Sequence, residues 1–77
     1  MEIKVLGPGC PKCEKTFALV GEVLAGSGAG ASLSKVTDFQ EMVSMGVFST
    51  PAVAVNGEVK CSGRIPSREE IVSWIGA

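Results

Sequence analysis

Residues 51–55 (Pro-Ala-Val-Ala-Val) constrain the fold more than any other segment of the chain. Both alternating sets of positions in this run are apolar, so a strand formed here would be buried on its two faces. A proline is tolerated at the first residue of a strand. We therefore expect a central strand in a sheet that carries helices on its faces, which is an α/β architecture.

The dipeptide Asn56-Gly57 follows this strand directly. It favours a two-residue type I′ turn, because both turn positions need a positive φ. The chain should then return as a strand whose side chains alternate between the faces of the sheet. The alternation predicts Glu58 and Lys60 on one face, with Val59 and Cys61 on the other.

The remaining segments switch between strand-like and helical periodicity. Together with the hairpin they predict the order β-α-β-α-β-β-α, with four strands and three helices. The other expected elements are a strand over 2–6, a helix from Pro11 to the glycines at 26–28, a weaker strand over 32–36, and helices starting near 37 and 67.

The second helix has a candidate capping box. Thr37 is expected as the N-cap residue, with Gln40 as the third helical residue. Phe39, Met42 and Val43 are expected to form the apolar stripe of this short helix.

The third helix has a second capping box. Ser67 is expected as the N-cap residue and Glu70 as its partner. Ile71, Val72 and Ile75 then form the predicted buried stripe.

Composition excludes several classes of function. The chain has 77 residues, enough for one domain over 1–77, and a formal net charge of −1 without a basic run. A nucleic acid or an anionic membrane would need such a run. No apolar stretch reaches the roughly 18 residues of a membrane span, and the first residues do not resemble a signal peptide. We expect a cytoplasmic protein that works as a monomer.

The chain contains three cysteines and no histidine. An odd number of cysteines is a poor disulfide framework for a secreted domain. Cys–His catalysis and mixed Cys/His zinc sites are excluded. In a reducing compartment, a close cysteine pair is more often catalytic or metal-binding than structural.

Two cysteines form the motif Cys10-Pro11-Lys12-Cys13, at the junction of the first strand and the first helix. Proline is favoured as the first residue of a helix, which makes Cys10 the N-cap residue and Cys13 the third helical residue. The unpaired N–H groups and the helix dipole stabilise a thiolate at the N-cap position, and Lys12 adds a positive charge.

This geometry suits thiol–disulfide exchange. Residues three apart in a helical turn lie about 5–6 Å apart, which is close enough for a disulfide. The glycines around Pro8 would leave the approach to Cys10 open. We expect Cys10 to attack a partner disulfide and the more buried Cys13 to resolve the mixed disulfide.

Two other functions fit the same motif. The cysteine pair, with or without Cys61, could hold Cu(I) or As(III), although a tetrahedral zinc site would want a fourth ligand. The domain could also be a non-catalytic interaction module, which would leave the placement of the motif unexplained. Cys61 itself is more simply a small buried apolar residue.

These motifs together resemble the thioredoxin superfamily, in particular its very short bacterial and archaeal members. The resemblance covers nearly the whole chain. Its carriers are Cys10 to Cys13, Ser49-Thr50-Pro51 before the third strand, Asn56-Gly57, and Gly63 to Ser67 before the last helix.

The resemblance implies a thioredoxin-like fold, in which a four-stranded mixed sheet is flanked by three helices. It also implies a cis peptide bond at Thr50–Pro51 and a substrate-docking wall formed by these two residues. Ser49, Pro11 and Lys12 are the further candidate substrate-binding residues. The implied partners are protein disulfides and a disulfide reductase, and the implied activity needs no bound cofactor. Phe48 would either add an apolar docking patch or belong to the core.

The chain departs from ordinary thioredoxins beside the cysteines. Gly9 stands where those proteins have tryptophan, and Pro11-Lys12 replaces their Gly-Pro. No acidic residue clearly matches their buried carboxylate, since Glu14 is expected to point to solvent. The usual reductase and redox potential therefore do not follow from the resemblance.

Overall fold

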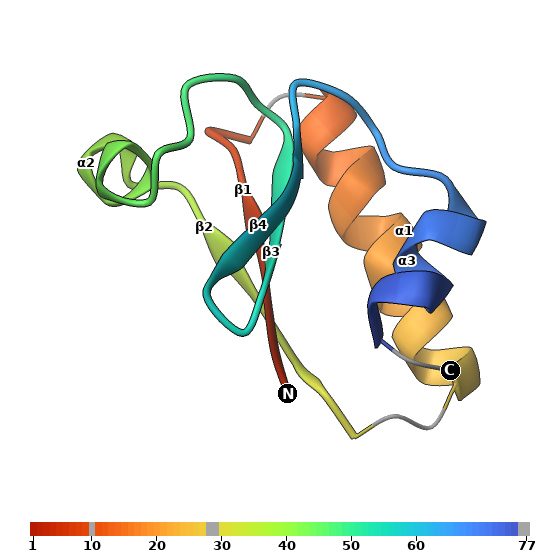
Figure 1. Cartoon of the computed structure of the whole chain (residues 1–77). Helices are drawn as coiled ribbons and strands as arrows, with labels where there is room; N and C mark the ends of the chain where they lie inside the picture. The colour runs from red at the N-terminus through yellow and green to blue at the C-terminus, as the bar shows by residue number, and fades with distance from the viewer. Residues whose placement is uncertain (10, 28–29, 76–77) are drawn as a thin grey trace.

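The computed structural model describes residues 1–9, 11–27 and 30–75 of the chain (Figure 1). Its element order confirms the predicted succession of strands and helices, and with it the α/β class. The elements are β1 (Glu2–Leu6), α1 (Pro11–Ser27), β2 (Ser32–Val36), α2 (Phe39–Ser44), β3 (Ala52–Val55), β4 (Glu58–Ser62) and α3 (Arg68–Ile75).

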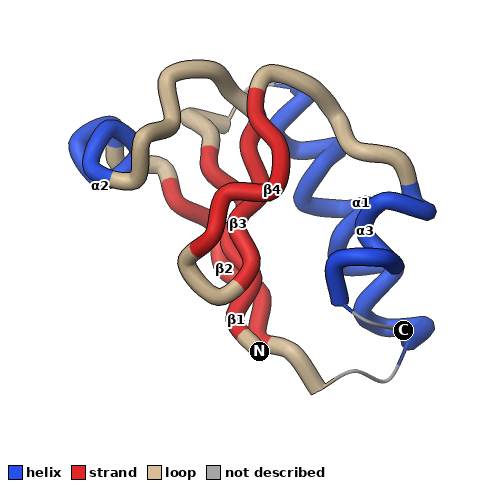
Figure 2. The backbone as a smooth tube through the Cα atoms, in the orientation of Figure 1, coloured by secondary structure: helices blue, strands red, loops and turns tan. Residues whose placement is uncertain are grey.

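The four strands form one mixed sheet in the order β2-β1-β3-β4. β1 pairs in parallel with β2 and antiparallel with β3, and β3 pairs antiparallel with β4. Helices α1 and α3 cover one face of the sheet, and α2 lies on the other side (Figure 2). The expected four-stranded sheet with three helices is confirmed.

The sheet separates two apolar cores, and β3 contributes to each of them. Val53 and Val55 pack into the core beneath α1 and α3, together with Ile3, Val5, Val20, Val23, Cys61, Ile71 and Ile75. Ala52 and Ala54 pack into the smaller core on the α2 side, together with Leu6, Val36, Met42 and Val47. This division explains why both alternating sets of residues 51–55 are apolar.

The turn after β3 has the predicted conformation, because φ is 52° at Asn56 and 83° at Gly57. The predicted faces of β4 are wrong. Val53 pairs with Cys61 whereas Ala54 pairs with Val59, so an irregularity in the register accommodates one extra residue. A bulge of this kind reverses the alternation. Cys61 consequently joins the core beneath α1 and α3, and Val59 packs against the α2 side.

The capping of α2 also differs from the prediction. Asp38, rather than Thr37, is the N-cap residue, and its Oδ1 accepts a hydrogen bond from the Gln40 N–H at 2.9 Å. A carboxylate at this position satisfies one of the unpaired N–H groups of the first turn.

The expected apolar stripe of α2 is reduced to one residue. Met42 is buried, but the Phe39 side chain is 76% exposed and Val43 is 40% exposed. Because α2 has only six residues, it turns a single side chain into the core.

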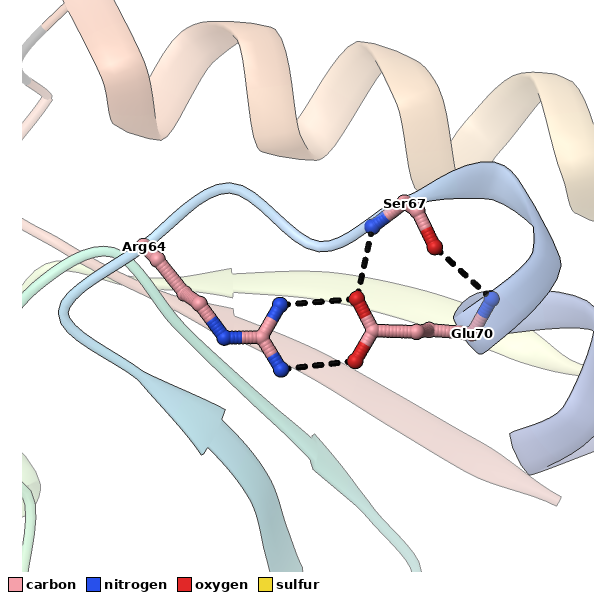
Figure 3. A network of polar contacts seen from close by, with 3 residues as sticks. All are labelled: Arg64, Ser67 and Glu70. Carbon is pink, nitrogen blue, oxygen red and sulfur yellow. Dashed lines mark hydrogen bonds and ion pairs between the residues drawn. The ribbon is translucent and has the colours of Figure 1, made fainter.

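The capping box of α3 is confirmed. The Glu70 N–H donates to Ser67 Oγ at 3.1 Å, and the Ser67 N–H donates to Glu70 Oε1 at 3.0 Å (Figure 3). Arg64 adds two parallel hydrogen bonds to the same carboxylate, at 2.7 and 2.6 Å. The guanidinium, and after it the Ser67 N–H, lower the pKa of Glu70 to about 2.

This lowered pKa predicts a contribution to acid stability. The folded-state pKa of Glu70 lies below its ordinary value of 4.5, so the stabilisation is complete above pH 4.5 and is lost as the pH falls toward 2. We expect Glu70→Gln to reduce the free energy of unfolding at pH 7 and to converge with the wild type near pH 2. Urea unfolding between pH 2 and 7 measures this. Glu69→Gln is the control, and its free energy of unfolding should vary with pH as that of the wild type does. The same pH dependence in all three proteins would contradict the prediction.

Candidate functional site

Helix α1 begins at Pro11, the position predicted from the sequence. Cys13 is therefore the third residue of the helix, and its side chain is only 2% exposed. Pro11 and Lys12 are exposed at the helix start, and the Lys12 carbonyl accepts a hydrogen bond from the buried Thr16 Oγ1 at 2.9 Å. Cys10, the other half of the pair, lies outside the described residues.

Gly7 is the point where three segments meet. A Cβ atom on Gly7 would overlap Cys13 Sγ and lie 3.0 Å from Cys13 Cβ. The same atom would lie 3.8 Å from Thr50 Cβ. The end of β1, the first turn of α1 and the segment before β3 thus lie close together around Gly7.

The segment before β3 contains the other candidate residues. The Thr50–Pro51 peptide bond is cis, Pro51 is buried, and Thr50 is partly exposed. Gly63, which follows β4, donates its N–H to the Pro51 carbonyl at 2.9 Å. A Cβ on Gly63 would lie 3.2 Å from that of the exposed Ser49, so this loop packs closely on residues 49–51.

A small apolar groove begins at Thr50. Its volume is about 130 Å³, and none of the described residues that line it is charged. Phe48 and Phe39, two of its walls, are 80% and 76% exposed. The described residues that line it are Pro8, Thr37, Phe39, Met42, Val47, Phe48 and Thr50. Of the two alternatives for Phe48, the exposed patch is the one observed.

Two of these features were missed or misjudged at the level of the sequence. Gly7 was interpreted only as a break that opens the approach to Cys10, but it is buried against Cys13. A glycine directly after a strand was the one available signal. Phe39 was assigned to the core, although its ring lies at the surface of the groove.

Glu14 is exposed, as expected, but it is paired. Its Oε1 accepts a hydrogen bond from Lys35 Nζ at 2.9 Å, and the same ammonium group lies 5.0 Å from the centre of the Phe17 ring. These contacts join α1 to the end of β2, which is an edge strand of the sheet.

Cys61 is a buried free thiol, as its apolar interpretation predicts. Burial raises its pKa, against the opposing effect of Arg64. It therefore resists ionisation, whereas a reactive cysteine needs a lowered pKa. In the part of the chain that the structure describes, no three Cys, His, Asp or Glu side chains are grouped to hold a metal ion. Among the helices of the described residues, none has both the length and the apolar composition of a membrane span.

Comparison with known proteins gives consistent matches. The family model described as "Thioredoxin domain" matches residues 1–76. The chain is 42% identical to a thioredoxin of Methanocaldococcus jannaschii over 90% of this chain and 79% of the relative. It is 32% identical to a thioredoxin of Methanothermobacter thermautotrophicus, over 92% of each chain. An uncharacterised 9.0 kDa protein of Acidithiobacillus ferrooxidans is 34% identical over 95% of this chain and 89% of that protein.

Proposed function

The chain belongs to the thioredoxin family, and from that premise we propose that it is a thiol–disulfide oxidoreductase that exchanges a Cys10–Cys13 dithiol with protein disulfides. Family membership supports a thiol–disulfide redox role in general. The observation that carries the specific proposal is the position of Cys13, buried in the first turn of α1 and in contact with Gly7.

The two cysteines have different roles in this proposal. The Cys10 thiolate attacks one sulfur of the partner disulfide, forming a mixed disulfide and releasing the other partner sulfur as a thiolate. The Cys13 thiolate then attacks the Cys10 sulfur, which releases the second partner thiol and leaves a Cys10–Cys13 disulfide. Two electrons reach the partner, and a disulfide reductase restores the dithiol.

Burial supports the role of Cys13 as the resolving residue. With 2% of its surface exposed, Cys13 is inaccessible to a bulky partner disulfide. Helical spacing predicts that a side chain three residues earlier, that of Cys10, would come within its reach. Lys12 and the N-terminal N–H groups of α1 would stabilise the thiolate at Cys10.

The surroundings of Thr50 support a polypeptide as the partner. Pro51 and Ser49 continue the proposed docking wall, and Pro11 and Lys12 lie exposed at the helix start. The groove beside Thr50 is smaller than the sites that usually hold a small-molecule ligand, which measure roughly 300–1,000 Å³. Its apolar walls suit one side chain of a partner protein. We place this activity in the cytoplasm, in a monomer.

A redox titration tests the proposal. The purified protein is equilibrated with glutathione at a series of ratios of reduced to oxidised form, and the state of its thiols is read by alkylation and mass spectrometry. We expect one reversible two-electron transition that joins Cys10 and Cys13, and catalysed reduction of a protein disulfide. Absence of a reversible intramolecular disulfide would refute the proposal.

Phe48 should contribute to the use of protein substrates. We expect Phe48→Ser to lower kcat/KM for a protein disulfide about fivefold, or roughly 1 kcal/mol, because the ring covers only part of the partner's apolar surface. The rate with a small aromatic disulfide should not change. Phe48→Leu is the conservative control and should retain most of the activity. Equal losses on both substrates would show that Phe48 acts on the cysteines instead.

A further inference from the structure

We propose that Gly7 is a positioning residue for Cys13, and that the missing side chain at Gly7 favours the disulfide form of the protein over its dithiol form. The inference rests on the proposed function, since it concerns the equilibrium of the Cys10–Cys13 pair. It assigns to Gly7 a role in the redox equilibrium, beyond that of ending β1.

Space, rather than backbone conformation, is what requires glycine here. The φ angle of Gly7 is outside the left-handed region, so an alanine could adopt the same backbone conformation. Its methyl group, however, would overlap Cys13 Sγ and lie 3.0 Å from Cys13 Cβ. Non-bonded carbon atoms prefer a separation of about 3.5–4.0 Å.

The surroundings leave the methyl group little room elsewhere. The Gly7 N–H donates to the Val36 carbonyl at 2.9 Å, which holds this segment against the end of β2. Thr50 Cβ would lie 3.8 Å from the new methyl group, already in van der Waals contact. The overlap between the new methyl group and Cys13 must therefore be relieved mainly by a movement of the Cys13 sulfur.

That movement has different costs in the two redox states. In the dithiol, Cys13 Sγ can rotate about the Cα–Cβ bond to another staggered position. In the disulfide, the same sulfur is bonded to Cys10, and the narrow geometry of the bond restricts its position. A methyl group on residue 7 should therefore destabilise the disulfide more than the dithiol. It should also slow the resolving step, in which Cys13 Sγ approaches the Cys10 sulfur.

The test compares Gly7→Ala with the wild type in the glutathione titration. We expect the equilibrium to shift about tenfold toward the dithiol, equivalent to about 30 mV for a two-electron couple. Mixed disulfides with a protein substrate should also last longer. Gly26→Ala is the matched control, because a Cβ on this helical glycine meets no atom within 4 Å. It should leave both quantities unchanged.

The outcomes separate the two hypotheses. If the wild type forms no reversible disulfide, the proposed function fails. If it does, and Gly7→Ala titrates like Gly26→Ala, the positioning role of Gly7 is overturned.

A second variant covers the case in which Gly7→Ala does not fold. Gly7→Ala is then made in a Cys13→Ala background, where the obstructing sulfur is absent. We expect this double variant to fold under reducing conditions, with a free energy of unfolding close to that of Cys13→Ala alone. A double variant that is also unfolded would overturn the inference.

Discussion

Cys13→Ser should accumulate a mixed disulfide between Cys10 and a protein substrate, whereas Cys10→Ser should form no adduct with the substrate. The difference follows from the exposed start of α1 and the burial of Cys13. Without Cys13, the attack by Cys10 has no intramolecular second step. Each variant should lose multiple-turnover reduction of a protein disulfide by a factor of about 10³ or more, because neither thiol completes the exchange alone.

Mass spectrometry of the substrate adduct, together with the turnover rate, measures this prediction. Cys61→Ala is the control. Cys61 is a buried thiol of raised pKa in the core beneath α1 and α3, so its removal should leave the turnover rate close to that of the wild type. A stable adduct on Cys13 in the Cys10→Ser variant would reverse the assigned roles. Loss of activity in Cys61→Ala would bring the third thiol into the mechanism.

Ile71→Ala should have the largest effect on stability. Ile71 is 1% exposed and anchors α3 in the core that it shares with α1 and the sheet. Truncating a buried isoleucine costs about 2–5 kcal/mol, from lost burial and from the cavity that remains. A small domain has a total stability of about 5–15 kcal/mol, so the loss is a large fraction of it.

Ile65→Ala is the matched control for this prediction, because it makes the same chemical change at a side chain that is 36% exposed. Its cost should be well below that of Ile71→Ala in urea unfolding. Should Ile71→Ala be unfolded in buffer, Ile71→Val gives a measurable value of about 0.5–1.5 kcal/mol. Equal costs at positions 65 and 71 would contradict the assigned packing.

Several elements could be predicted from the sequence because they depend on residues a few positions apart. Asn56-Gly57 forms its turn from its own backbone preferences. Pro11 begins α1, and Ser67 and Glu70 cap α3 through hydrogen bonds within one helical turn. Apolar residues in both alternating sets of positions 51–55 predicted a central strand covered on both faces, which is where β3 lies.

Other features depend on contacts that no local pattern contains. Val59 and Cys61 face opposite cores because the pairing of β4 with β3 contains an irregularity. A prediction from strict alternation places both residues on the same face. Phe39 is exposed because α2 is short and lies where only Met42 reaches the core. Arg64 donates to Glu70 of the α3 capping box because of the conformation of the loop before α3, which the capping-box motif does not predict.

The same division holds for the candidate site. The spacing of Cys10 and Cys13, and the proline between them, predicted a helix start with Cys13 as its third residue. Residues 7, 13 and 50 meet only because β1 pairs with β3 and α1 packs back onto the sheet. A local motif can thus specify the chemistry of the cysteines, since it depends on the first turn of one helix. The space around Cys13 was decided by the tertiary structure, because it depends on how distant segments pack.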